Sequence, residues 1–142
     1  MTTRAQLSAS AELTGGHTDL MVAALGGDTA TVRTLLEKQV DPNAKDDEGR
    51  TALMFAVTNL QTDAVDALLD HGADVNVRAR DGGTALILAA SAGDIGIVRA
   101  LLNKGADVSA KLTPTGKTAR MLAKEKGYDG VARLLEQAGA RE

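Results

Sequence analysis

Few side chains in this sequence have the types and spacing that could support catalysis or ligand binding. The two histidines, His17 and His71, lie in different parts of the chain, and neither has a neighbouring partner at the spacing of a metal site. The tripeptide Gly116-Lys117-Thr118 resembles the end of a phosphate-binding P-loop, but that motif requires a glycine where Lys111 stands. We therefore interpret the tripeptide as a turn glycine, an exposed lysine and a threonine that caps a helix.

An acidic run, Asp46-Asp47-Glu48-Gly49, is the other candidate ligand site. It lacks the spaced ligands and the closing glutamate of a calcium-binding loop, so we interpret it as a solvated loop tip. The sequence contains no cysteine, which excludes a thiolate nucleophile, a thiolate metal site and a disulfide. From these residues we expect no enzymatic activity, no cofactor and no bound metal.

The composition is that of a single domain with an aliphatic core. Of the 142 residues 44% are apolar, yet there is one Phe, one Tyr and no Trp. No apolar run approaches the length of about 18 residues that crosses a membrane, and the first 16 residues lack the apolar centre of a secretory signal. We expect a cytoplasmic protein without a membrane contact. Because the chain is acidic and almost free of aromatic residues, we expect no nucleic-acid partner.

Charge is distributed unevenly along the chain, whose net charge is −3. Residues 19–76 contain 11 acidic and 4 basic side chains, whereas residues 77–142 contain 7 acidic and 11 basic ones. This asymmetry has two interpretations. It is either undirected variation on a solvated surface, or the mark of a dipolar molecule that orients a charged partner along its length.

A phrase of six residues occurs four times, and this predicts a repeat architecture. The copies are Thr18-Asp-Leu-Met-Val-Ala23, Thr51-Ala-Leu-Met-Phe-Ala56, Thr84-Ala-Leu-Ile-Leu-Ala89 and Thr118-Ala-Arg-Met-Leu-Ala123. Their threonines are spaced by 33, 33 and 34 residues. Each threonine stands where the N-cap of a short helix is expected, because its hydroxyl can accept hydrogen bonds from free amides in the first turn.

A second helix is predicted after a polar or glycine-containing break in each copy. Apolar residues at offsets of three and four give this helix one buried face, as at Val32, Leu35 and Leu36. Left-handed helix stops follow it at Gly72, Gly105 and Gly139. Gln39 occupies this place in the first copy, where the left-handed conformation costs a side chain about 1 kcal/mol.

Polar segments rich in turn residues follow the helix stops and predict projecting hairpins or loops. They cover residues 41–49, 74–82 and 107–116. The third segment is one residue longer than the others, and we place the extra residue near Pro114.

In these features the chain resembles the ankyrin repeat family. The family's helix-opening phrase Thr-Pro-Leu-His-x-Ala is matched from Thr51 to Ala56 and from Thr84 to Ala89, and its Gly-Ala-Asp-Val-Asn segment occurs from Gly72 to Asn76. The resemblance implies an all-α ankyrin-repeat solenoid of stacked helix-turn-helix units with projecting β-hairpin loops. It implies one domain over residues 15–142, with four repeats at about 15–46, 47–79, 80–112 and 113–142. Alanine replaces the family's proline, and methionine or isoleucine its histidine, which predicts less rigid hairpins.

The two ends of the array are predicted to be caps. The last copy carries charges where the copy before it is apolar: Arg120, Lys124 and Glu136 replace Leu86, Ala90 and Leu102. Such charges require a solvated outer face, as a terminal repeat has. Thr31, in the place of Ile97, indicates the same for the first copy. Residues 1–14 are expected to form a tail that is partly disordered or contains one short helix.

The family resemblance also implies a function, namely a protein–protein interaction module that binds one partner across its concave face, as an adaptor or an inhibitor. Candidate contact residues at the hairpin tips are Asp47, Glu48, Arg50, Arg78, Arg80, Asp81 and Lys111. Those on the first helices are Phe55, Thr58, Asn59, Ser91 and Ala92, with Leu25 and Gly26 in the first copy. We expect specificity to depend on Arg50, Phe55, Arg78 and Arg80.

Phe55 has two interpretations, a core filler or a partly exposed anchor, and aromatic and arginine side chains dominate the energetics of interfaces. The alternative function is a structural, self-associating or engineered scaffold without a specific ligand. A protein that binds a foreign partner is expected to be monomeric alone.

Overall fold

The computed structural model describes residues 16–140, and within this range it contains eight helices. The chain divides into two compact units at the boundary between Ala73 and Asp74, called unit 1 and unit 2 below. Among the described residues the fold is an all-α repeat fold, as the spacing of the threonines predicts. The expected tail at residues 1–14 lies outside the described residues.

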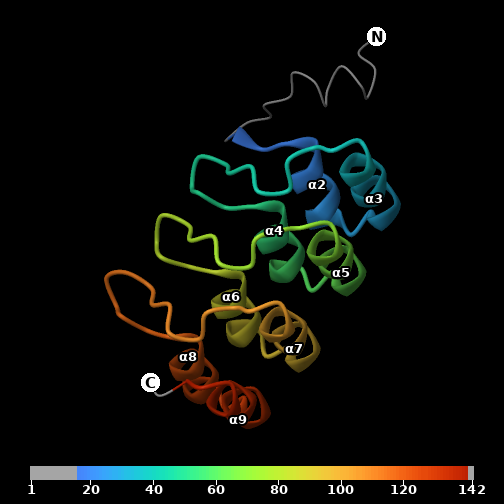
Figure 1. Ribbon diagram of the computed structural model, residues 1–142. Coiled ribbons are helices and arrows are strands. Elements are labelled where there is room, and N and C mark those ends of the chain that lie inside the picture. Colours follow the sequence, from blue (N-terminus) through green and yellow to red (C-terminus); the bar gives the residue numbers. More distant parts are fainter. Residues whose placement is uncertain (1–15, 141–142) are drawn as a thin grey trace. The chain divides into compact units, whose positions relative to one another are not determined.

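Unit 1 contains two helix pairs. The first pair is α2 (Asp19–Gly26) with α3 (Thr29–Glu37), and the second is α4 (Ala52–Thr58) with α5 (Thr62–Asp70). The first helices of the two pairs pack against each other, and so do the second helices: α2 contacts α4, and α3 contacts α5 (Figure 1). The first helix of each pair, α2 or α4, is called the inner helix below.

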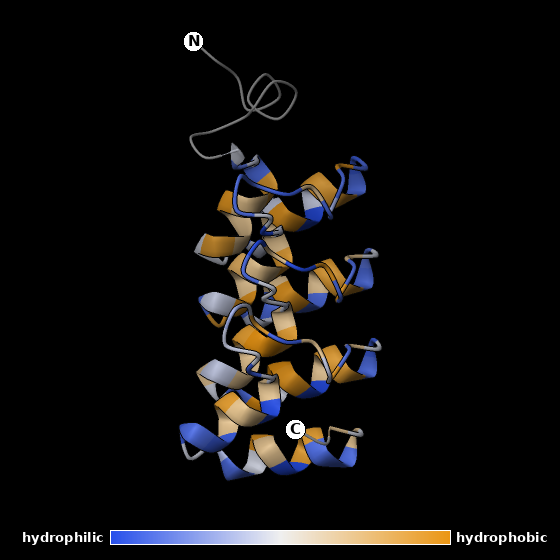
Figure 2. Cartoon of the chain, turned by 90° about the vertical axis from the view of Figure 1, so that its left-hand side faces the viewer, coloured by the Kyte–Doolittle hydropathy of each residue, from blue (hydrophilic) through white to orange (hydrophobic). Residues whose placement is uncertain are grey.

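Unit 2 repeats this arrangement. Its pairs are α6 (Ala85–Ala92) with α7 (Ile95–Asn103), and α8 (Ala119–Glu125) with α9 (Asp129–Gln137). The inner helices α6 and α8 contact each other, and α7 contacts α9. In Figure 2 the helices carry most of the hydrophobic residues, and the long loops between pairs are mainly hydrophilic. No helix in the described range is long and apolar enough to span a bilayer.

The repeated threonines begin the inner helices, as predicted. Thr18, Thr51, Thr84 and Thr118 each accept a hydrogen bond from the backbone N–H three residues on. Thr51, Thr84 and Thr118 are buried. Their hydroxyls therefore satisfy amides that water could not reach, which explains why a small hydrogen-bonding residue recurs at this position.

Left-handed residues end the second helix of each pair. The prediction is confirmed for Gly72, Gly105 and Gly139, and Gln39 takes the same conformation with φ of 64°. A further left-handed residue with a side chain, Leu60 at φ 55°, ends the turn between α4 and α5. At the equivalent places in the other repeats stand Gly27, Gly93 and Gly127, all with positive φ.

The predicted hairpins are tight turns rather than strands. In the first two loops an amide donates to a carbonyl three residues earlier, from Gly49 to Asp46 and from Gly82 to Ala79. In the third loop Gly116 donates to Leu112, four residues earlier, so the extra residue lies in the turn that contains Pro114. Within residues 16–140 regular β-strands are absent, although an isolated antiparallel bridge joins Lys111 to Thr118.

Charged residues of the last helix pair lie at the surface, as expected for a cap. Arg120 donates from Nε to Glu136 Oε1 at 2.9 Å, which links α8 to α9. Lys124 is exposed. The charges that replace apolar residues in this copy are therefore accommodated by pairing or by solvent, and not by burial.

Candidate protein-binding surfaces

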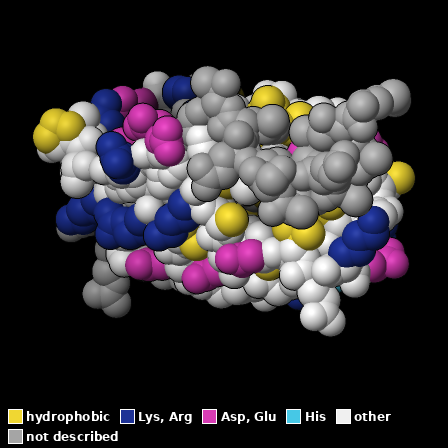
Figure 3. All heavy atoms as spheres, turned by 90° about the horizontal axis from the view of Figure 1, so that it is seen from above, with side chains coloured by type: hydrophobic (Ala, Val, Ile, Leu, Met, Phe, Trp, Pro, Cys, Tyr) yellow, Lys and Arg dark blue, Asp and Glu magenta, His cyan; other side chains and the backbone are white. Residues whose placement is uncertain are grey.

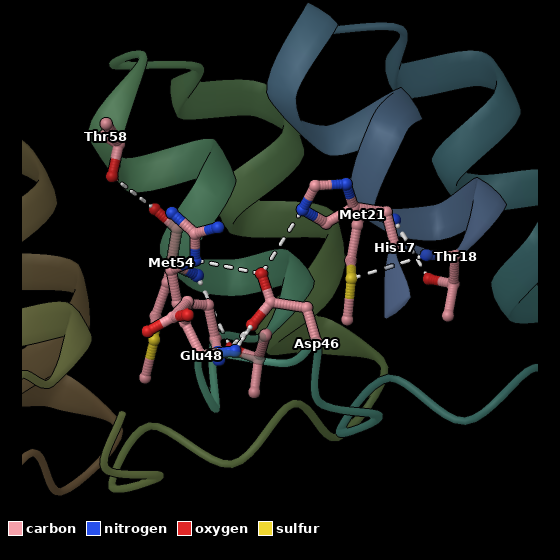
Figure 4. A network of polar contacts seen from close by, with 9 residues as sticks. His17, Thr18, Met21, Asp46, Glu48, Met54 and Thr58 are labelled. Carbon is pink, nitrogen blue, oxygen red and sulfur yellow. Dashed lines mark hydrogen bonds and ion pairs between the residues drawn. The ribbon is translucent and has the colours of Figure 1, made fainter. Parts of the chain in front are cut away.

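Asp46 organises the loop between α3 and α4 in unit 1. Its Oδ1 accepts hydrogen bonds from the backbone N–H of Glu48 at 2.9 Å and of Arg50 at 2.8 Å. Its Oδ2 accepts one from Arg50 Nε at 2.9 Å (Figure 4). The interpretation of this acidic run as a solvated tip is wrong for Asp46, whose side chain has 0% exposure. The carboxylate is buried because donors from its own loop replace water.

The pKa of Asp46 reflects this environment. Burial raises the pKa of the carboxyl, but hydrogen bonds from the backbone and side chain of Arg50 and from the Glu48 amide lower it, and the Arg50 charge adds to them. The lowering effects prevail, so the pKa lies below its ordinary value. Asp46 is therefore an anion at neutral pH that holds the loop in one conformation.

His17 and Arg50 flank the half-buried ring of Phe55 on α4. The His17 ring meets the Phe55 ring edge-on, with centroids 5.4 Å apart and an angle of 86°. The Arg50 guanidinium lies 4.9 Å from the Phe55 centroid, within the range of a cation–π contact. His17 Nε2 is 3.3 Å from Asp46 Oδ2 but lacks the alignment of a hydrogen bond. Phe55 is partly exposed and is held in position by both neighbours.

The end of α4 provides two further candidate residues. Thr58 is exposed and donates to the carbonyl of Met54 at 2.8 Å. Asn59 donates from Nδ2 to the carbonyl of Leu25 at 3.0 Å, which ties the end of α4 to the end of α2. Asn59 therefore supports the packing of the two repeats as well as lying at the surface.

The loops of unit 2 are bound to each other. Arg78 donates from Nη2 to the carbonyl of Lys111 at 2.7 Å, and the Thr113 amide donates to the carbonyl of Asp81 at 2.8 Å. Arg78, which we expect to contact the partner, therefore forms a hydrogen bond between two loops of its own unit. Arg80 is exposed at the same loop.

Asp107 stabilises the loop at residues 107–116. Hydrogen bonds from the hydroxyl and then the amide of Ser109 lower the pKa of Asp107 and outweigh the effect of burial, with a smaller contribution from the Arg78 charge. Asn76 joins this loop to the preceding one, since it accepts from the Asp107 amide at 2.8 Å and donates to the Gly105 carbonyl at 3.2 Å.

Lys126 is a residue that the sequence interpretation missed. It donates from Nζ to Ser91 Oγ at 2.8 Å and to the Ser91 carbonyl at 3.0 Å. Lys126 occupies the same position in its repeat as Asn59, which binds the carbonyl of Leu25. In both units, a polar side chain therefore completes the end of the preceding inner helix, and Ser91 is partly covered. Ala92 beside it is exposed.

The candidate residues accordingly form two separate groups. Unit 1 holds Asp47, Glu48, Arg50, Phe55, Thr58 and Asn59, and unit 2 holds Arg78, Arg80, Asp81, Ser91, Ala92 and Lys111. On the face drawn in Figure 3, acidic and basic side chains intermingle with isolated apolar ones.

Comparison with known families gives one result. The family model described as ankyrin repeats (3 copies) matches residues 6–79 and residues 77–141. Comparison with curated proteins gives no match. The family match covers most of the chain, including both units.

Proposed function

Because the chain belongs to the ankyrin repeat family, whose repeats generally mediate protein–protein interactions, we propose that it is an adaptor or inhibitor that binds one protein partner. The contacts would come from the inner helices and the loop tips. The observation that supports this proposal most directly is Phe55, partly exposed and held between His17 and Arg50.

Phe55 has the properties of an interface anchor. A partner that covers it gains apolar burial, and little entropy is lost because His17 and Arg50 already restrict the ring. Arg50 adds a positive charge at the rim, with 43% of its side chain exposed. Aromatic residues next to arginine are enriched among the residues that contribute most to binding.

In unit 2 we assign the contact role to Arg80 and a supporting role to Arg78. Arg80 is exposed, whereas Arg78 holds the Lys111 carbonyl. Replacement of Arg78 would loosen the loops and reduce binding indirectly. Arg80 is therefore the cleaner position at which to test a charged contact.

We expect Phe55→Ala and Arg80→Glu each to weaken binding of the partner by about tenfold, because each removes one contact of a typical interface hot spot. The partner would be isolated from the native host by affinity purification, and affinities would be measured by calorimetry. Phe55→Leu, which keeps an apolar side chain, should retain most of the affinity. Unchanged affinity in both Phe55→Ala and Arg80→Glu, with helical content intact, would reject the proposed contact residues.

Self-association is the second candidate function, and one observation favours it. The described residues of unit 1 contain ten acidic and four basic side chains, and those of unit 2 contain seven acidic and ten basic ones. Opposite charges of this kind could join copies head to tail. The adaptor proposal instead predicts a monomer at every concentration in sedimentation velocity at low salt. Mass that rises with concentration and falls with added salt would favour self-association.

A further inference from the structure

The turn between α4 and α5 contains a backbone strain that the other repeats avoid. Leu60 has φ of 55°, in the left-handed region, where a side chain with a Cβ is penalised. The other three repeats place Gly27, Gly93 and Gly127 here, with φ of 73°, 76° and 78°. For a bulky apolar residue this conformation is a true outlier.

The Leu60 side chain does not offset this strain by deep burial. It is 46% exposed, among the largest exposures of any large apolar residue in the described chain. Leu25, at the end of α2, is 37% exposed. A strained and exposed leucine is unfavourable for stability alone, so a role in binding is the more economical explanation.

Leu25 and Leu60 belong to neighbouring turns. Asn59, next to Leu60, donates to the carbonyl of Leu25 at 3.0 Å. The Gln61 side chain, on the other side of Leu60, lies against Gly27. The two turns are thus in contact at two points, and we call the surface formed by Leu25, Leu60 and the adjoining Asp28 and Asp63 the turn edge of unit 1.

Charge indicates what kind of partner would cover the turn edge. Asp28 caps α3 and Asp63 lies in the first turn of α5, and both residues are exposed. The described part of unit 1 carries a balance of six negative charges, with ten carboxylates against four basic side chains. A positively charged segment would be attracted to this surface, and an acidic one repelled.

We propose that the turn edge of unit 1 is a second binding surface, which takes a basic protein segment with a large apolar side chain placed against Leu25 and Leu60. This surface includes the end of the inner helix α2 but contains neither Phe55 nor a loop tip. Lysine or arginine residues of the segment would lie near Asp28 and Asp63.

The test uses the full chain, a library of displayed 12-residue peptides, and the variant Leu60→Gly. Peptides that bind the native chain would be selected after depletion on Leu60→Gly, then synthesised and measured by calorimetry. We expect the selected peptides to carry Lys or Arg beside a large apolar residue, and to lose at least tenfold in affinity with Leu60→Gly. Asp63→Asn should weaken them about threefold and reduce the salt dependence of binding.

Leu60→Gly also separates binding from folding. Glycine adopts this φ without penalty, so the variant should melt at the native temperature or about 3 °C above it while binding is lost. If the variant melts lower, Leu60→Asn, which tolerates the left-handed region, would take its place in the selection.

Two outcomes would overturn the proposal: no peptides that discriminate against the variants, or selected peptides that are acidic. Peptides that depend on Phe55 and not on Leu60 would be removed by the depletion step, so the two proposals can fail separately.

Discussion

Replacement of Asp46 by alanine is expected to lower the free energy of unfolding by about 2 kcal/mol, because it leaves three part-buried donors without their charged acceptor. The Glu48 amide, the Arg50 amide and Arg50 Nε would lose their partner together. The measurement is urea unfolding followed by circular dichroism. Asp47→Ala is the matched control, since Asp47 is adjacent and exposed, and its change should be near zero.

The contribution of Asp46 should also depend on pH. Its pKa is lower in the folded protein than the value of about 3.9 expected in the unfolded chain. Its stabilisation is therefore complete above that value and is lost as pH falls through the lower folded pKa. The stability difference between the native chain and Asp46→Ala should accordingly shrink between pH 4 and pH 2. A difference that stays constant over this range would show that the ionised carboxylate is not the source of the effect.

The second large effect is expected at Gly93, where alanine should cost about 3 kcal/mol, combining left-handed strain with overpacking. Gly93 has φ of 76°, and a methyl group there would lie 2.8 Å from the Tyr128 ring carbon Cζ. Tyr128, at the start of α9, would have to move away from the turn after α6. Thermal and urea unfolding would measure the loss.

Gly127 provides the control for Gly93. It has nearly the same φ, 78°, but a methyl group there would have no heavy atom within 4 Å. Gly127→Ala should therefore cost only the conformational penalty of about 1 kcal/mol. The difference between the two variants isolates the contact with Tyr128. Equal losses would show that the ring moves without cost.

The periodic residues of the sequence predict most of the fold, because the same helix starts, buried faces and helix ends recur in each repeat. The threonine at the start of each inner helix, the apolar stripe of the second helix and the left-handed stops all follow from local backbone chemistry. Gln39 illustrates this, since its position in the period alone predicts the positive φ that it adopts. The extra residue near Pro114 was located in the same way.

The sequence patterns do not show which partner each polar side chain has in the folded loops, or where a side chain strains the backbone. Asp46 looks like a solvated acid in an acidic run, but the same position in the next two loops is Ala79 and Leu112, both partly buried, and this apolar register indicates that the position is not fully solvated. Arg78 is exposed, yet its partner is a carbonyl 33 residues away. Leu60 stands where the other repeats have glycine, and its positive φ shows that leucine strains the backbone at this position.

Tyr128 gives the chain a built-in optical reporter. It is the sole tyrosine of a sequence without tryptophan, and its ring covers Gly93 of the neighbouring repeat. Its fluorescence therefore reports selectively on the separation of the last helix pair from the one before it. Because stability differs from region to region in repeat proteins, comparison of this emission with circular dichroism would show whether the terminal pair frays before the rest, with no label attached.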